Sequence, residues 1–207
     1  GIISGYKDGT YRPNQPITRA QAAKILAGVL KLDTAGAQAT FTDVPVSYEH
    51  YGAIAALAEK KILNGYTDGT FKPNQPITRA QMAKILANAF ELSSVFETLP
   101  FTDVFVQAES FRYINALYSY AITTGTSAST YSPGNRVTRG QLAVFITRAE
   151  NAEKQTLLLN MRDEGYINIE NWSTNTDVVH IVASGNELHV LPRKVGTGQL
   201  LVSGISN

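Results

Sequence analysis

Three arginines recur at intervals of sixty residues, at Arg19, Arg79 and Arg139, each directly after a threonine and two residues before a glutamine. A guanidinium carries a permanent charge and several donors in a planar fork, which suits it to carboxylates and phosphates. The residue type and its recurrence therefore predict a site for an anion. The alternative at each position is structural, with the arginine paired to a carboxylate of a neighbouring repeat.

The residues on either side of these arginines predict the start of a helix. Three threonines each stand three residues before a glutamine, in the pairs Thr18 and Gln21, Thr78 and Gln81, and Thr138 and Gln141. This is the spacing of a capping box, in which threonine and glutamine side chains each accept from the other residue's backbone N–H. The arginine then takes the first helical position, where the helix dipole disfavours a cation. Its presence there favours an anion held between the guanidinium and the free N–H groups of the helix start.

The segment around each arginine is an internal repeat. Residues 5–30 and 65–90 are identical at 19 of 26 positions, and a more divergent copy begins at Gly125. Each copy starts with a glycine, runs through a proline-containing loop that cannot be helical, and continues as a helix from the threonine. In copies two and three a first helix is predicted after Phe41-Thr-Asp-Val44 and Phe101-Thr-Asp-Val104. The register predicts that about 20 residues carrying the equivalent first helix precede Gly1 in the natural chain.

These patterns predict two structural parts. Residues 1–152 form three helix-loop-helix units (1–34, which lacks its first helix, 35–94 and 95–152) that pack as a mostly α, pseudo-threefold bundle, because a pair of short helices cannot bury its apolar stripes alone. Tyr11, Phe71 and Tyr131 are expected to fill the shared core. After residue 156 short β-type runs predict a small all-β domain, Ig-like or similar, over 156–207. Roughly 50 residues is few for a two-sheet sandwich, so this domain is compact or cut short.

Composition excludes several classes of function. The net charge is +1 and Lys and Arg are scattered, so no basic stripe for nucleic acid exists. No apolar run reaches the roughly 20 residues of a membrane span, and without cysteine there is no thiol chemistry. Three histidines and no recurring carboxylate pair in a site-like setting argue against an enzyme, a metal site or a cofactor. The recurring Asp43 and Asp103 are assigned to local hydrogen bonds at helix starts.

The run Phe41-Thr-Asp-Val44, a helix, Gly65-Tyr-Thr-Asp-Gly-Thr-Phe-Lys-Pro73 and Ile77-Thr-Arg-Ala-Gln81 resembles the S-layer homology motif, and the resemblance covers residues 1–150. It implies a secreted protein of the Gram-positive cell wall and S-layer. Grooves between neighbouring motifs would hold the secondary cell wall polysaccharide, which often ends in pyruvylated N-acetylmannosamine. Other S-layer subunits would be partners through regions beyond this fragment.

By this resemblance the three arginines match the family's arginine that meets the ketal carboxylate. The surrounding ligand-binding candidates are the capping threonines Thr18, Thr78 and Thr138, the glutamines Gln21, Gln81 and Gln141, and the glycines Gly5, Gly65 and Gly125. Tyr51 and Phe111, at the starts of the first helices, are candidates for stacking on a sugar or for core packing. The glutamines replace a glutamate of the family, which removes a negative charge from beside the anion.

The third copy departs most from the pattern, which predicts unequal grooves. It has Ala128 and Ser129 where the others have an Asp-Gly turn, and Ser132 where they have Arg12 and Lys72. The Arg139 groove is therefore expected to bind most weakly. Two alternatives to S-layer anchoring stay open: a protein–protein module whose grooves seat acidic side chains, and a cell-wall anchor for a surface enzyme. The β pattern after residue 156 favours the S-layer subunit.

Overall fold

The structure is a computed structural model that describes residues 5–94, 96–155, 157–160, 166–174, 179–184, 187–192 and 200–206, with side chains up to residue 152. Within these residues there are five helices: α1 (Arg19–Val29), α2 (Tyr51–Glu59), α3 (Arg79–Ala89), α4 (Phe111–Ser119) and α5 (Arg139–Gln155). In the described residues up to 155 the regular elements are therefore all helices, as the sequence predicts.

The helix starts at the three arginines are confirmed. Thr18 and Thr78 both have extended backbone (φ −82°, ψ 162°), and both halves of the capping box form at each. At α5 the Thr138 N–H donates to Gln141 Oε1 at 3.1 Å, and the Gln141 N–H donates to Thr138 Oγ1 at 3.3 Å. Each box satisfies two backbone donors of a helix terminus, which fixes where the helix begins.

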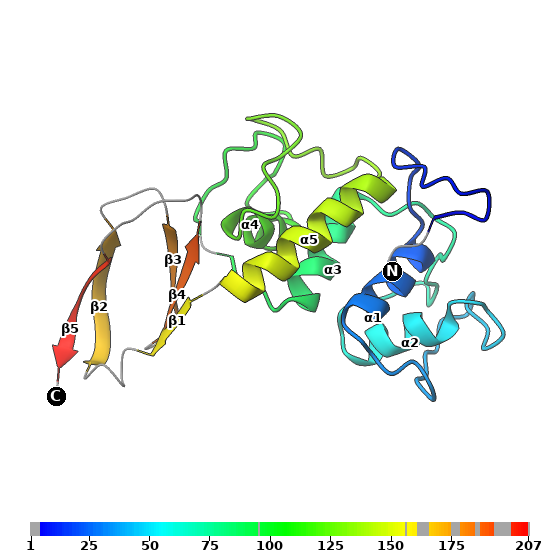
Figure 1. The fold of residues 1–207 in the computed structure, drawn as a ribbon, viewed down its shortest axis with the longest axis horizontal. Coiled ribbons are helices and arrows are strands. Elements are labelled where there is room, and N and C mark those ends of the chain that lie inside the picture. Colours follow the sequence, from blue (N-terminus) through cyan, green and yellow to red (C-terminus); the bar gives the residue numbers. More distant parts are fainter. Residues whose placement is uncertain are drawn as a thin grey trace.

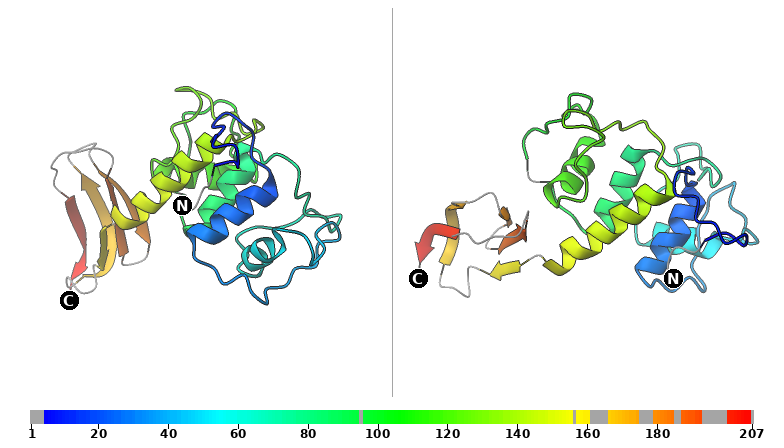
Figure 2. Two further views of the ribbon diagram at one scale, coloured as in Figure 1. Left: turned by 45° about the vertical axis from the view of Figure 1, so that its right-hand side comes forward. Right: turned by 45° about the horizontal axis from the view of Figure 1, so that its top comes forward.

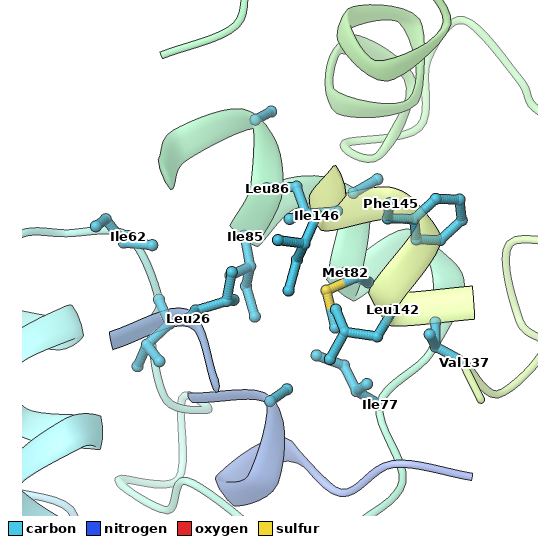
Figure 3. Close-up of a cluster of buried hydrophobic side chains, with 14 of the residues drawn as sticks. Leu26, Ile62, Ile77, Met82, Ile85, Leu86, Val137, Leu142, Phe145 and Ile146 are labelled. Atoms are coloured by element: carbon cyan, nitrogen blue, oxygen red, sulfur yellow. The ribbon is translucent and has the colours of Figure 1, made fainter. Parts of the chain in front are cut away.

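The second helices of the units, α1, α3 and α5, gather at the centre of the helical part, with α2 against α1 and α4 against α3 (Figures 1 and 2). Their facing side chains form the core, in which Met82 and Leu86 of α3 lie beside Leu142 and Ile146 of α5 (Figure 3). Met82, Leu86 and Leu142 are fully buried. The core therefore joins all three units, because no single unit could bury these faces.

Aromatic residues of the loops plug this core in two of the three units. Phe71 is 1% exposed and Tyr131 is 0% exposed, as predicted. Tyr11, their counterpart in the first unit, is only half-buried. The rings of Phe41 and Phe101 pack on Phe71 and Tyr131, with centroid distances of 5.3 and 5.8 Å. Tyr11 therefore differs from its counterparts in its exposure.

The three loops are hydrogen-bonded to one another in a closed cycle just before the capping boxes. The Ile17 N–H donates to Val137 O at 2.9 Å, the Val137 N–H to Ile77 O at 2.9 Å, and the Ile77 N–H to Ile17 O at 3.0 Å. All three side chains are fully buried. Buried backbone groups need partners, and here each partner belongs to another unit.

The described residues beyond α5 include five strands: β1 (Leu157–Asn160), β2 (Tyr166–Thr174), β3 (Val179–Ser184), β4 (Glu187–Pro192) and β5 (Leu200–Ser206). Three of them form an antiparallel sheet in the order β1-β4-β3, and β2 pairs with β5. The residues that join most of these strands lie outside the described part of the chain. The Ig-like or similar domain over 156–207 therefore stays a prediction.

Burial of Tyr131 predicts loss of stability at alkaline pH. Burial raises the pKa of Tyr131 to about 12, whereas an unfolded tyrosine titrates near 10. The contribution of this tyrosine to the free energy of unfolding is fully present below pH ~10. It is lost as the pH rises to ~12, a change of about 3 kcal/mol for one such group. Urea unfolding at about pH 9 and about pH 12 measures this loss. Between the two pH values the free energy of unfolding should fall less for Tyr131→Phe than for the wild type. Tyr6→Phe, which removes a hydroxyl from an exposed hydrogen bond to Gln15, should drop like the wild type.

Candidate ligand-binding grooves

Arg19 of α1 is buried and bound to the loop of the second unit. Arg19 is only 6% exposed, and its Nε donates to Phe71 O at 2.7 Å. Its Nη2 donates to Asn64 O at 3.0 Å, and its Cζ lies 4.4 Å from the Phe71 ring centroid. The guanidinium therefore meets backbone carbonyls and an aromatic face of a neighbouring unit.

Arg79 of α3 repeats this arrangement against the third unit with one difference. It is 3% exposed, its Nε donates to Tyr131 O at 2.7 Å, and its Cζ lies 4.4 Å from the Tyr131 ring centroid. Its Nη2 is buried but has no hydrogen-bond acceptor among the residues that the structure describes. A buried unpaired donor is costly, and more so on a charged group. This nitrogen is therefore an unsatisfied donor, unlike the Nη2 of Arg19, which donates to Asn64 O.

The third arginine makes the same contact with the loop of the first unit. Arg139 is 7% exposed, its Nε donates to Tyr11 O at 2.9 Å, and its Cζ lies 4.9 Å from the ring centroids of both Tyr6 and Tyr11. Each arginine thus reaches the aromatic loop residue of the next unit. The sequence left open that each arginine pairs with a carboxylate of its neighbour, but all three Nε atoms donate to backbone carbonyl oxygens.

The backbone before Gly125 differs from that before Gly65, where a carbonyl accepts from Arg19. Asn64, whose carbonyl accepts from Arg19, corresponds to Thr124 in the third unit. There the Gly125 N–H donates to Thr123 Oγ1 at 3.2 Å, whereas the second unit has Leu63 at that position. Since the C=O and N–H of a trans peptide point in opposite directions, this bond aims the Thr124 carbonyl away from the Thr123 hydroxyl. Gly125 also has a positive φ of 86°.

Burial changes the electrostatics of the arginines. Desolvation lowers the pKa of both Arg19 and Arg79, while the charges of Asp43 and Asp103 act in the opposite direction. An arginine stays protonated at neutral pH even so. A desolvated cation interacts more strongly with an anion than one in water does, provided that the anion reaches it.

The donors at the helix starts correct one sequence prediction. The Arg19 N–H donates to Gln75 O at 2.9 Å and the Ala20 N–H to Pro73 O at 3.0 Å. In the same way the backbone N–H of Arg79 donates to Asn135 O and the backbone N–H of Arg139 donates to Gln15 O. The prediction that these N–H groups are free for an anion was wrong, because the proline-containing loop of the neighbouring unit supplies their acceptors.

The recurring aspartates also act differently from the prediction. Asp43 accepts from the Phe71 and Lys72 N–H groups, both at 2.7 Å, and Asp103 accepts from Tyr131 and Ser132 at 2.8 and 2.7 Å. The sequence predicts local hydrogen bonds for these aspartates. That prediction was wrong, because the bonds span 28 or 29 residues. Each aspartate holds the loop whose carbonyl in turn accepts from the arginine of the preceding unit.

Two inter-unit grooves collect many of the predicted site residues. The Arg19 groove, a cavity of about 290 Å³, is lined by Arg19, Ile62, Leu63, Asn64, Gly65, Tyr66, Ala80, Gln81, Lys84, Ile85, Glu109, Ser110 and Tyr113. The Arg79 groove, of about 650 Å³, is lined by Pro13, Asn14, Arg79, Gly125, Thr126, Thr138, Gly140, Gln141, Val144 and Phe145. Both approach or fall within the size range of small-ligand sites.

The two grooves differ in charge. In the Arg19 groove Lys84 Nζ lies 2.6 Å from Glu109 Oε1, and this lysine lowers the pKa of Glu109. In the Arg79 groove Val144 takes the place of Lys84, and Arg79 is the charged residue of the lining. The sequence analysis missed the Lys84–Glu109 pair, although Lys24 and Glu49 recur sixty residues earlier and lie 3.9 Å apart.

The amide side chains of the two grooves differ as well. Gln81 Nε2 donates to the Tyr66 hydroxyl at 3.0 Å. The third unit has Thr126 in place of Tyr66, and Gln141 Nε2 has no acceptor among the described residues. Gln141 therefore offers a free donor at the wall of the Arg79 groove, while Gln81 does not offer one in its groove.

The groove glycines have a packing role. A Cβ on Gly65 would lie 2.5 Å from the Phe41 ring and 2.7 Å from Thr70 O, and one on Gly125 would lie 2.6 Å from the Phe101 ring. Any side chain at these glycines would therefore displace the ring of Phe41 or Phe101, which packs on Phe71 or Tyr131 in the core. The hydroxyls of Thr18 and Thr78 are engaged as helix caps, and neither residue lines the two grooves.

The remaining candidates lie elsewhere. The Tyr51 hydroxyl accepts from the Ala39 N–H at 3.1 Å, and Tyr51 and Phe111 pack against the core outside both grooves. By register Arg139, Gly5 and Gln21 correspond to Arg19, Gly65 and Gln81 of the Arg19 groove, and the counterparts of Ile62, Leu63 and Asn64 lie outside the described residues. Among described residues no cluster suited to a metal ion is found, nor a helix long and apolar enough to cross a membrane.

Comparison with known proteins identifies the repeats. The sequence matches the S-layer homology domain over residues 1–23, 40–83 and 100–143. It is 33% identical over 158 residues to the surface-layer 125 kDa protein of Lysinibacillus sphaericus (74% of this chain, 13% of that protein). It is 32% identical over 158 residues to a cellulosome-anchoring protein of Acetivibrio thermocellus (72% and 35%), and 31% over 160 residues to an uncharacterized cell wall amidase of Bacillus anthracis (74% and 29%). The chain thus spans between 13% and 35% of the length of these curated relatives. The chain belongs to the S-layer homology domain family.

Proposed function

We propose that this chain is a secreted module that holds a surface-layer protein on the bacterial cell wall without a covalent bond. It does so by binding an anionic secondary cell wall polysaccharide between its repeats. The family match and the names of the surface-layer and anchoring relatives support the attachment to the wall. The single observation that carries the ligand is that Arg79 lines a groove between units and has a buried Nη2 without a hydrogen-bond partner among the described residues.

The Arg79 groove supplies groups suited to an acidic sugar. Arg79 Nη2 would donate to one carboxylate oxygen of a pyruvyl ketal on a terminal N-acetylmannosamine, a charge-assisted bond that also relieves the unpaired donor. Gln141 lines the same groove, and its Nε2 suits the hydroxyl and acetamido groups of the sugar as a donor. With no carboxylate in its lining, the groove does not repel an anion.

The order of the grooves differs from the sequence-based expectation. That expectation placed the weakest binding at Arg139 and treated Arg19 and Arg79 as equal. We propose instead that Arg79 binds the acid group most strongly, because the Nη2 of Arg19 already donates to Asn64 O and its groove contains Glu109. An incoming anion in the Arg19 groove would have to replace existing hydrogen bonds.

Calorimetry with purified wall polysaccharide tests this function. We expect saturable binding to the native polymer and at least tenfold weaker binding after mild acid has removed the pyruvyl ketals, since one charge-assisted bond of about 1.5–3 kcal/mol is lost. Equal binding of the two polymers would contradict recognition of the acid group. An acidic peptide that binds more tightly than the polymer would favour the protein–protein module.

A specific observation favours one second candidate. The match to a cell wall amidase shows that similar repeats occur in a protein named as an enzyme. The same grooves would then attach an enzyme to the wall, and this chain would be its anchor. Both candidates make the same prediction for the grooves and differ only in what the anchored protein does.

A further inference from the structure

The second unit contains the only asparagine–glycine pair of the sequence, Asn64-Gly65, in the loop that follows α2. Its counterparts in the other units are Ser4-Gly5 and Thr124-Gly125. Asparagine before glycine readily loses its side-chain amide, because glycine has no Cβ to hinder closure of a five-membered imide ring. Asparagine counts among the thermolabile residues of proteins. The second unit therefore has a position, absent from the other two, at which the chain can modify itself.

The local structure leaves both reacting groups free. Asn64 is exposed, and neither its side-chain amide nor the Gly65 N–H has a hydrogen-bond partner among the described residues. A bonded N–H would have to lose its acceptor before the nitrogen could attack. The third unit shows the contrast, because there the Gly125 N–H donates to Thr123 Oγ1 at 3.2 Å. The Asn64 amide and the Gly65 nitrogen can therefore react without first breaking a hydrogen bond.

Arg19 acts on the same peptide group. Its Nη2 donates to Asn64 O at 3.0 Å, and this oxygen belongs to the peptide bond whose nitrogen is that of Gly65. When that nitrogen loses its proton, the negative charge is shared with the carbonyl oxygen through the resonance of the peptide. A buried guanidinium at this oxygen stabilises the charged form, as a donor does in an oxyanion hole. The second unit thus combines a reactive pair with a group that activates it.

We propose that Asn64 converts to aspartate and isoaspartate in a reaction assisted by Arg19, with water as the co-reactant. Hydroxide removes the Gly65 N–H proton, and the nitrogen lone pair forms a bond to Asn64 Cγ. The bond from Cγ to Nδ2 breaks, and Nδ2 takes a proton from water and leaves as ammonia. Water then adds to one of the two imide carbonyls and breaks the bond of that carbon to the Gly65 nitrogen, which regains a proton. One water is consumed and one ammonia is released.

The isoaspartyl product changes the partner of Arg19. In this product the main chain runs through Cβ and Cγ of residue 64, so the former carbonyl of Asn64 becomes part of a free α-carboxylate. The group that accepts from Arg19 Nη2 then carries a charge, and the hydrogen bond becomes an ion pair. The Arg19 groove, whose lining already contains Glu109, thereby loses its attraction for an anion. This consequence for a ligand rests on the proposed function, whereas the conversion itself does not.

Mass spectrometry on the 207-residue chain tests the conversion without any ligand. The variant Thr124→Asn places a second asparagine–glycine pair at the same register, where Arg79 Nη2 has no acceptor among the described residues and the Gly125 N–H is bonded. The folded variant is incubated at mildly alkaline pH and digested, and the change from amide to carboxyl is followed at residues 64 and 124 of the same molecules. We expect residue 64 to convert about fivefold faster or more. In urea, where both pairs lose their folded surroundings, the two rates should agree within about twofold.

A second variant removes the activating group itself. Arg19→Gln should slow conversion at residue 64 of the folded chain about fivefold or more and leave the rate in urea unchanged. Circular dichroism shows whether this variant is folded, and the comparison within the Thr124→Asn chain does not depend on it, because Arg19 stays in place there. Equal rates at residues 64 and 124 of the folded chain would overturn the role of Arg19. A folded chain that keeps Asn64 intact while the chain in urea converts would overturn the site.

Discussion

Arg79→Lys is expected to weaken binding of a pyruvylated disaccharide at least tenfold. Lysine keeps the positive charge but has one nitrogen, which cannot replace both the Nε bond to Tyr131 O and the free Nη2. A lysine that stays bonded to the carbonyl leaves the groove without its donor, and one that turns to the ligand leaves the carbonyl unpaired. The loss of a charge-assisted bond corresponds to about 1.5–3 kcal/mol.

Arg19→Lys is the matched control for this experiment. Arg19 has the same sequence context, a similar burial and the same Nε bond to the next loop, but its Nη2 already donates to Asn64 O. We expect Arg19→Lys to destabilise the fold about as much as Arg79→Lys while changing the affinity less than about twofold. Calorimetry on both variants, with circular dichroism to show that each is folded, gives the comparison. Equal losses of affinity in the two variants would assign the anion to both grooves.

Asp103→Asn is expected to lower the free energy of unfolding by about 3 kcal/mol. The Asp103 carboxylate accepts from two consecutive backbone N–H groups at 2.8 and 2.7 Å, and an amide replaces one acceptor oxygen with a donor that faces an N–H. The loop that it holds carries the fully buried Tyr131, whose carbonyl accepts from Arg79. Loosening this loop therefore weakens the core plug and the groove together.

Asp8→Asn is the control for this second variant. Asp8 accepts from Thr10 within its own turn and pairs with Arg12, with side chains that are 48% exposed. Water can replace these contacts, so we expect little change in stability. Urea unfolding at neutral pH measures both variants. Similar small losses for Asp103→Asn and Asp8→Asn would show that the long-range bonds of Asp103 contribute no more than a surface turn.

The capping boxes, helix starts and core residues could be predicted because they depend on residues three or four positions apart. Thr18 and Gln21 define the start of α1 by themselves, and the apolar spacing defines the buried face. The role of Asp43 could not be predicted, because its partners lie 28 and 29 residues away and depend on how the loop returns to the helix. The sixty-residue recurrence shows which positions are equivalent but not which units touch.

The candidate site was predictable in its residue types and not in its bonding. The sequence indicates Arg19, Arg79 and Arg139 as equivalent, whereas in the structure the Nη2 of Arg19 has an acceptor and that of Arg79 has none among the described residues. Beside Arg79 the Thr123 hydroxyl accepts from the Gly125 N–H, where the second unit has Leu63. A change of this kind alters the direction of a single peptide group. Such an effect depends on backbone geometry two residues from the groove, so composition and spacing carry no signal for it.

The hydrogen-bonded cycle of Ile17, Val137 and Ile77 limits how further units could join these three. A contact between different faces of identical units yields either an endless filament or a finite ring, depending on whether its rotation closes. Here the third unit returns to the first, so the three units are the covalent counterpart of a cyclic trimer. A fourth unit would find no open end to join, and another molecule could not extend the chain of bonds. Any contact with further copies of the chain must therefore use surfaces that take no part in this ring.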